Sequence, residues 1–298
     1  MTRAARRRSH RNGRGATMKR LGNVAIVGVG LIGGSIGLAL RQRNLAESVI
    51  GVGRRQVSLR IARRVGAITH TTIDLAKGVA QAELVIICTP PGQIAGHVQE
   101  AARHCPEGTL ITDAGSTKER IVAALEGQLP RGCRFLGGHP IAGGEKTGAN
   151  YSNADLFDGR VTVLTPTKNT RAEDYDLLEE FWQALGSVVV QMPADEHDRA
   201  LALTSHLPHS AAAALANTVP EVYYRLAGTG LLDSARLASG DPELWQQILL
   251  QNRENVLKAL EQFVGQIKVL HTALGNGDEA GLKQFLTRAK KNRDALGN

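Results

Sequence analysis

A glycine motif at a strand-to-helix junction constrains the fold of this chain more than any other feature. Residues 22–30 form a β-branched apolar run that predicts a buried strand, and residues 34–43 have a helical Ala/Leu period. In the GxGxxG spacing between them, glycines permit a tight turn and close approach of a pyrophosphate, while the helix N-terminus offers free N–H groups. The motif therefore predicts a dinucleotide site. The residues expected to hold the dinucleotide are Gly28, Gly30, Leu31, Ile32 and Gly33.

The end of the second predicted strand bears on which dinucleotide is bound. A site for NAD usually has an acidic residue at this point, which accepts hydrogen bonds from the ribose hydroxyls. Here the strand at residues 49–52 is followed by Gly53, Arg54 and Arg55, with no carboxylate. Two guanidinium groups suit the 2′-phosphate of NADP. We therefore favour NADP over NAD, although Arg54 and Arg55 as solvated loop charges remain the alternative.

The remaining periodicity predicts two domains. Apolar runs at 84–88, 109–112, 161–164 and 188–191 alternate with helical segments at 56–65, 93–104, 116–129 and 171–185. Such alternation is typical of βαβ units around a parallel sheet. After Pro193 no strand is expected, and long Ala/Leu-rich stretches lie at 195–218, 242–273 and 278–293. We predict an α/β Rossmann-type dinucleotide-binding domain over residues 21–193, followed by an all-α helical domain over residues 194–298.

The formal net charge of +8 comes from one end of the chain. Residues 1–20 hold eight Lys and Arg and no acid, so residues 21–298 are balanced. We expect a disordered basic tail rather than an arm that binds nucleic acid. Cys88, Cys105 and Cys133 lack metal-ligand spacing, so no metal site is expected and a reducing, cytoplasmic setting is favoured. No apolar run approaches the length that spans a membrane.

Two downstream segments carry candidate chemistry. In DAGSTK, Ser116 follows a predicted strand and begins a predicted helix, at the sheet edge where ligands bind. A simple N-cap is the alternative role for this serine. In FLGGHPIAGGE, His139 lies between glycines and a proline, an unusual setting for a core residue. Because glycines allow a ligand to approach the backbone, His139 is a candidate catalytic group.

Together the segments of this chain resemble a known family, the prephenate and arogenate dehydrogenases of tyrosine biosynthesis. The resemblance extends over roughly residues 22–273 and depends on several segments in order: VGVGLIGGSIG, DAGSTK, FLGGHPIAGGEKTG with ADLFDGR and VLTP, DEHDRALALTSHLPH, and DSARLASGDPELW followed by Asn252. It implies an oxidative decarboxylation, in which a cyclohexadienyl alcohol loses hydride to nicotinamide and its ring carboxylate as CO2. The substrate is prephenate or arogenate, and the sequence leaves this choice open.

The resemblance also implies roles for individual residues. His139 matches the histidine that takes the proton of the ring hydroxyl, and Ser116 matches the serine that hydrogen-bonds this histidine. Arg236, three residues after Asp233, matches the cation that clamps the second carboxylate, although residues 229–233 depart from the usual pattern. His206 and His209, in the SHLPH segment, match residues that face the substrate. Glu145 matches an acid that lies near the substrate-binding arginine. His197 also matches, and we expect it to cap or pack a helix.

In the family the helical domain forms a homodimer and closes the cleft. Apolar positions between Leu244 and Val269 predict a buried helix face, either in the core or at a dimer interface. One alternative function is that of another two-domain dehydrogenase, of the β-hydroxyacid type, for which Lys258 would be the catalytic lysine. A second is a non-catalytic regulator that senses the nucleotide. The intact set of Ser116, His139 and Arg236 argues against the regulator.

Overall fold

The computed structural model describes residues 18–127 and 129–297, and most of the predicted basic tail, residues 1–17, lies outside them. The first half of the chain forms one eight-stranded sheet in the order β3-β2-β1-β4-β5-β6-β7-β8. The strands are β1 (Leu21–Val27), β2 (Ala46–Val52), β3 (His70–Thr72), β4 (Leu84–Ile87), β5 (Leu110–Asp113), β6 (Arg134–Pro140), β7 (Val161–Thr165) and β8 (Val188–Gln191).

The direction of the strands fixes where a ligand can bind. Strands β1 to β6 are parallel, β7 is antiparallel to β6, and β8 is parallel to β7. The chain reverses its order of winding between β1 and β4, which pair from Val24 with Leu84 to Val27 with Ile87. In open parallel sheets the crevice at the carboxyl ends beside such a reversal is the ligand site. The predicted Rossmann-type architecture is confirmed.

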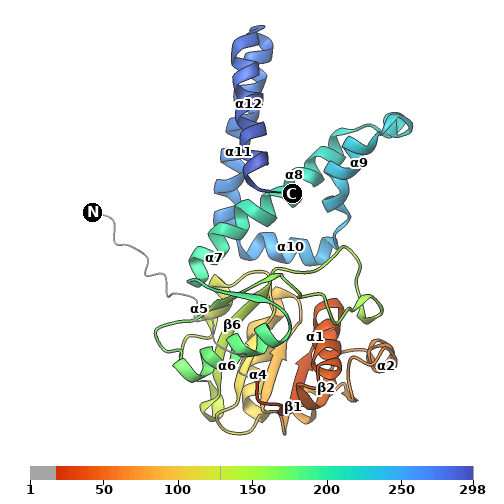
Figure 1. The fold of residues 1–298 in the computed structure, drawn as a ribbon, viewed down its shortest axis with the longest axis vertical. Helices are drawn as coiled ribbons and strands as arrows, with labels where there is room; N and C mark the ends of the chain where they lie inside the picture. The colour runs from red at the N-terminus through yellow and green to blue at the C-terminus, as the bar shows by residue number, and fades with distance from the viewer. Residues whose placement is uncertain (1–17, 128, 298) are drawn as a thin grey trace.

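Helices cover both faces of the sheet (Figure 1). One core contains Ile26, Ile36 and Trp182, and the other contains Ile87 and Val98. Each fully buried apolar side chain of this size stabilises the fold by about 1.5–3 kcal/mol relative to exposure. The helices of this part are α1 (Leu31–Gln42), α2 (Gln56–Arg64), α3 (Leu75–Val79), α4 (Pro91–His104), α5 (Glu119–Ala124) and α6 (Ala172–Ala184).

After β8 the described chain is helical, and α10 lies against the sheet domain while α11 and α12 extend away from it (Figure 1). No described helix is both long enough and apolar enough to cross a bilayer. The α-helices are α7 (Ala194–Leu201), α8 (Leu207–Thr218), α9 (Thr229–Ala235), α10 (Pro242–Gln251), α11 (Arg253–Gly275) and α12 (Glu279–Ala295). Between them lie the π-helix η3 (Ala202–His206) and the 3-10 helices η4 (Glu221–Leu226) and η5 (Arg236–Ser239); η1 (Pro130–Gly132) and η2 (Ala149–Tyr151) belong to the sheet domain.

Three sequence predictions require correction. The glycines and proline around His139 suggest that it lies outside the core, but it is buried in a central strand, β6. The helix predicted from Ser116 begins only at Glu119, so this serine is not its N-cap. The helical stretch at 242–273 is divided at Asn252, where backbone angles of −105° and 28° end α10 before α11 begins.

Candidate active site

The glycine turn after β1 has the geometry of a phosphate cradle. Gly28 has a φ of +94°, which favours glycine, and a Cβ on Gly33 would collide with the carbonyl oxygen of Gly28. A Cβ on Gly30 would meet nothing within 4 Å. Gly30 is also the N-cap of α1, and no side chain caps the free N–H groups at the start of this helix. The turn therefore combines open space with free donors at the positive end of a helix, as a bound pyrophosphate requires.

The loop after β6 returns to this turn. Ser152 donates from Oγ to the carbonyl oxygens of Gly30 and Leu31, at 3.4 and 3.3 Å. The backbone N–H of Asn153 donates to Ser35 Oγ at 3.0 Å, so a second contact joins the loop to α1. The strand that carries His139 is therefore attached, through the loop that follows it, to the predicted dinucleotide site.

His139 is the first member of a buried hydrogen-bonded chain. Its Nδ1 lies 2.8 Å from Nε2 of His197, and Nδ1 of His197 lies 2.7 Å from Oδ1 of Asp198. His139 is 8% exposed and His197 is fully buried. We expected only a capping or packing role for His197, but both of its ring nitrogens connect the predicted base to a carboxylate. Sequence reasoning missed this because the two histidines are 58 positions apart.

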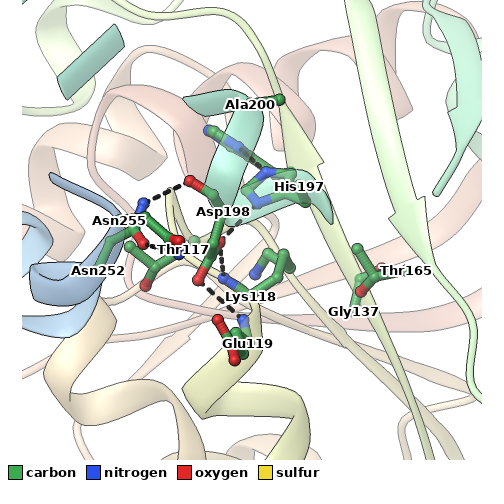
Figure 2. A network of polar contacts seen from close by, with 12 residues as sticks. Thr117, Lys118, Glu119, Gly137, Thr165, His197, Asp198, Ala200, Asn252 and Asn255 are labelled. Carbon is green, nitrogen blue, oxygen red and sulfur yellow. Dashed lines mark hydrogen bonds and ion pairs between the residues drawn. The ribbon is translucent and has the colours of Figure 1, made fainter. Parts of the chain in front are cut away.

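Asp198 fixes the direction of the protons along this chain. Its carboxylate accepts the backbone N–H groups of Lys118 at 2.8 Å and Glu119 at 3.0 Å, at the N-terminus of α5 (Figure 2). A charged carboxylate held by these donors accepts the Nδ1–H of His197. His197 then accepts at Nε2 from the Nδ1–H of His139. Nε2 of His139 is thereby left unprotonated, and no hydrogen bond from the described residues engages it.

The surroundings keep His139 neutral. Burial lowers the pKa of this imidazole well below its ordinary value, and electrostatic interactions with the neighbouring His197, Lys118 and His206 lower it further. At neutral pH the ring is therefore a base with an available lone pair.

Ser116 lies in the turn between β5 and α5 and is half-buried. Within the described chain its hydroxyl makes no hydrogen bond with His139, whose Nδ1 is directed to His197 instead. The neighbouring Thr117 connects the two domains, since its hydroxyl donates to Oε1 of Gln251 at 2.5 Å. The structure thus brings Ser116 to the same sheet edge as His139 without the predicted contact between them.

Arg236 and Glu145 meet, although 91 positions separate them. Nη1 of Arg236, in η5, forms an ion pair with Oε1 of Glu145, in the loop after β6. Both side chains are partly exposed, at 60% and 40%. A guanidinium has five N–H donors, so the pair leaves Arg236 with donors for a substrate carboxylate.

His206 and His209 are buried where η3 continues into α8. Nδ1 of His206 lies 3.1 Å from Nδ2 of Asn252, and Nε2 of His206 is buried without a partner in the described structure. Burial lowers the pKa of His206 to about 4. The ring of His209 stacks on Trp245 with centroids 3.5 Å apart, and its Nδ1 has no partner within the described residues. Each ring therefore has one buried nitrogen without a hydrogen-bond partner in the described structure.

Comparison with known proteins identifies the family. The models for the nucleotide-binding domain and the dimerization domain of prephenate dehydrogenase match residues 36–191 and 193–288. The chain belongs to the prephenate dehydrogenase family. A prephenate dehydrogenase of Bacillus subtilis is 33% identical over 281 residues, covering 92% of this chain and 76% of that protein. A cyclohexadienyl dehydrogenase of Zymomonas mobilis is 30% identical over 282 residues, covering 92% of this chain and 96% of that protein.

Solved structures agree with this family. Prephenate dehydrogenase of Aquifex aeolicus, in complex with hydroxyphenyl propionate and NAD+, has a TM-score of 0.86 at 34% identity, covering 93% of this chain and 98% of that chain. Synechocystis arogenate dehydrogenase has a TM-score of 0.75 at 28% identity, and the match covers 92% of this chain and 99% of that chain. The predicted family and dehydrogenase class, and a nicotinamide cofactor in general, are thereby confirmed.

The cofactor-binding candidates of this dehydrogenase include Arg54 and Arg55. Both are exposed directly after Gly53 at the end of β2, and neither has an ion-pair partner among the described residues. No acidic residue stands at this point of the chain. In the described part of the chain no group of three His, Cys, Asp or Glu side chains is placed to hold a metal ion.

Proposed function

We propose that this chain oxidatively decarboxylates prephenate or arogenate, with His139 as the base and NADP as the preferred cofactor. The observation that carries the proposal is the chain from His139 through His197 to Asp198, which leaves Nε2 of a neutral imidazole available. His139 lies near the end of β6, at the sheet edge that also holds the glycine turn. A neutral imidazole is the side chain best suited to take a hydroxyl proton near neutral pH.

The residues at the glycine turn fit a nicotinamide dinucleotide. Gly30 leaves space for the pyrophosphate, and the first N–H groups of α1 face it. When bound, the cofactor accepts the hydride that leaves C4 of the substrate ring. Arg54 and Arg55 are exposed where the second ribose is expected and supply cationic donors for a 2′-phosphate, which supports NADP over NAD.

The proton steps follow from the tautomer of His139. As the C4–H bond breaks, Nε2 of His139 takes the proton of the C4 hydroxyl and a ketone forms. The imidazolium is stabilised because Nδ1–H donates to His197, whose own Nδ1–H donates to Asp198. The bond to the ring carboxylate then breaks, its electron pair enters the ring, and the phenolate oxygen recovers the proton from Nε2. Aromatisation makes the step irreversible.

Substrate anchoring is assigned to groups around this base. Arg236 is proposed to bind the side-chain carboxylate, with Glu145 orienting the guanidinium. Ser116, at the end of β5, is proposed to hydrogen-bond the C4 oxygen together with His139. His206 and His209, which match the SHLPH segment of the family, are proposed to face the substrate.

A homodimer completes the proposal. Several apolar side chains of the helical domain are exposed in the single chain, and one of its two matching family models describes a dimerization domain. The apolar helix face predicted between Leu244 and Val269 is buried in its first part and exposed in its second part. Ile248 and Val256 are buried, whereas Val264 and Val269 are 46% and 52% exposed. We propose that the exposed part pairs with a second copy of the chain.

A four-way assay tests the function. Prephenate and arogenate are each supplied with NAD+ or NADP+, and reduced cofactor and CO2 are both measured. We expect equal amounts of the two products and a higher kcat/KM with NADP+. Replacing Arg54 and Arg55 by Gln and Ser should move the preference toward NAD+. Turnover of neither substrate would refute the function, and a constant cofactor ratio in the variant would refute only the NADP assignment.

A further inference from the structure

A fully buried ion pair lies directly behind the proposed catalytic residues and has no role in the proton steps. Nζ of Lys118 pairs with Oδ2 of Asp113, and both side chains have no solvent exposure. A buried lysine is costly unless its charge is well compensated, and buried pairs of this kind contribute little net stability. The pair therefore calls for a function other than stabilising the fold.

Asp113 holds the two backbone segments that carry Ser116 and His139. Oδ2 accepts the N–H of Gly115 at 2.8 Å, and Oδ1 accepts the N–H of Gly138 at 3.1 Å. Each of these glycines immediately precedes one of the two proposed site residues. Strand β5 pairs with β6 only as far as Thr112 with Leu136, so the carboxylate replaces the next strand partner of β6.

The neighbouring glycines lie close to this pair and to the side chains of Ile94 and Thr165. A Cβ on Gly115 would lie 2.8 Å from Oδ2 of Asp113, and a Cβ on Gly137 would lie 3.3 Å from Cδ of Lys118. A Cβ on Gly138 would lie 2.9 Å from the carbonyl oxygen of Asp113. The two glycines before His139 therefore leave room for the side chains of Thr165 and Lys118 and for the backbone of Asp113.

Lys118 also belongs to the hydrogen-bond network of the base (Figure 2). Its backbone N–H donates to Asp198 at 2.8 Å, the carboxylate at the end of the histidine chain. The charged and titratable groups around His139 are Lys118 and Asp113 from the β5–α5 segment, His197 and Asp198 from α7, and His206 from η3. Among these, Lys118 is the only lysine or arginine.

We propose that Asp113 and Lys118 are positioning residues: Asp113 sets the relative placement of Ser116 and His139, and the Lys118 ammonium cancels the charge of this carboxylate, which would otherwise favour the protonated form of His139. The inference deepens the proposed function and rests on it. The carboxylate provides two acceptor oxygens for two backbone donors, whereas the ammonium opposes a second positive charge close by. That opposition agrees with the lowered pKa of His139.

The test compares Lys118→Met, Asp113→Asn and the double variant with the wild type. In Lys118→Met the unpaired carboxylate of Asp113 favours the imidazolium form of His139. The acid limb of the pH profile of kcat/KM, where activity is lost as His139 is protonated, should therefore move upward by about one pH unit. In Asp113→Asn the ammonium is no longer neutralised, and the limb should move downward. The double variant should return it to within a few tenths of a unit of the wild-type value.

The level of kcat separates position from charge. An asparagine oxygen cannot accept both backbone N–H groups, so kcat in Asp113→Asn and the double variant should fall by about tenfold or more. Lys118→Met retains both contacts and should stay within about threefold. Titration of ¹⁵N-histidine signals in the cofactor-free protein measures the same pKa of His139 without turnover. Should Lys118→Met not fold, the opposite shift in Asp113→Asn tests the charge effect.

Asp174→Asn is the matched control. Asp174 pairs at 2.8 Å with Arg134 at the opposite end of β6 and is itself buried. Its loss should lower Tm without moving the acid limb. An unshifted acid limb and unchanged histidine titration in all three test variants would overturn the inference, as would equal shifts in the control. Inactive wild-type protein would instead contradict the proposed function.

Discussion

Replacing Asp198 by Asn removes one negative charge and changes few contacts. The amide oxygen can still accept from Lys118 and His197, which share Oδ1, whereas the new NH2 group faces the N–H of Glu119. One buried hydrogen bond at the start of α5 is therefore lost, at a cost of about 1–3 kcal/mol. For a chain of this size that corresponds to a fall in Tm of roughly 3–10 °C.

The effect on rate is electrostatic. The two hydrogen bonds of 2.8 and 2.7 Å lie on either side of one imidazole ring. The carboxylate is therefore roughly 8 Å from the Nδ1 of His139, which at an effective dielectric constant of 20 corresponds to about 2 kcal/mol. Because a tenfold rate change corresponds to about 1.4 kcal/mol, kcat should fall about 30-fold. KM for the substrate and Kd for the cofactor should change by less than threefold.

Steady-state kinetics, calorimetric binding of NADP+ and thermal unfolding measure these three effects. Asp195→Asn is the matched control: it lies on the same helix, but its carboxylate is exposed and forms only a surface ion pair with Arg199 at 2.7 Å. That variant should change neither kcat nor Tm appreciably. If Asp198→Asn lowers Tm and leaves kcat within threefold of the wild type, Asp198 only caps α5, and the proposed histidine chain does not assist the base.

Three further predictions concern binding and stability. Arg236→Ala should raise the substrate KM by roughly 10- to 100-fold with little change in Tm, and an unchanged KM would exclude this side chain as the carboxylate anchor. Gly30→Ala should keep the wild-type Tm but weaken cofactor binding in calorimetry, whereas Gly33→Ala should also lower Tm; equal Tm values in the two variants would contradict the cradle geometry. Because the pKa of His206 is about 4 in the fold and 6.5 ordinarily, the unfolded chain takes up the proton first, and stability should fall by up to about 3 kcal/mol as pH decreases from 6.5 to 4. Urea unfolding should show a shallower pH dependence for His206→Gln, and identical dependences would refute this assignment.

Local patterns predict those parts of the fold that depend on nearby residues. The glycine turn, α2, α6 and β8 are found close to their predicted bounds. In each, the hydrophobic period and the bounding residues lie within the element itself. The architecture then follows from strands alternating with helices. The same reasoning places Ser116 at the ligand-binding edge of the sheet, whereas the position of His139 on β6 is seen only in the structure.

Other features depend on distant residues and leave no local signal. Strand β6 has a weak strand composition because its glycines accommodate Lys118, Asp113 and Thr165, which come from other elements. It is a strand because β5 and β7 pair with it on both sides. The roles of His197 and of the buried lysine likewise become visible only in three dimensions. For Lys118, the available signal was a lysine at the end of DAGSTK, which periodicity alone assigns to a helix surface.

The base and the groups that orient it belong to different halves of the chain. His139 is on β6 of the sheet domain, whereas His197 and Asp198 are on the first helix of the helical domain. Asp198 also binds the start of α5, and its carbonyl oxygen accepts from Asn252 at 2.7 Å, at the junction of α10 and α11. A shift of either half would lengthen these hydrogen bonds, and the proton of His139 would then no longer be held on Nδ1. The seating of the helical domain against the sheet and the basicity of the proposed catalytic group are therefore one coupled property of this fold.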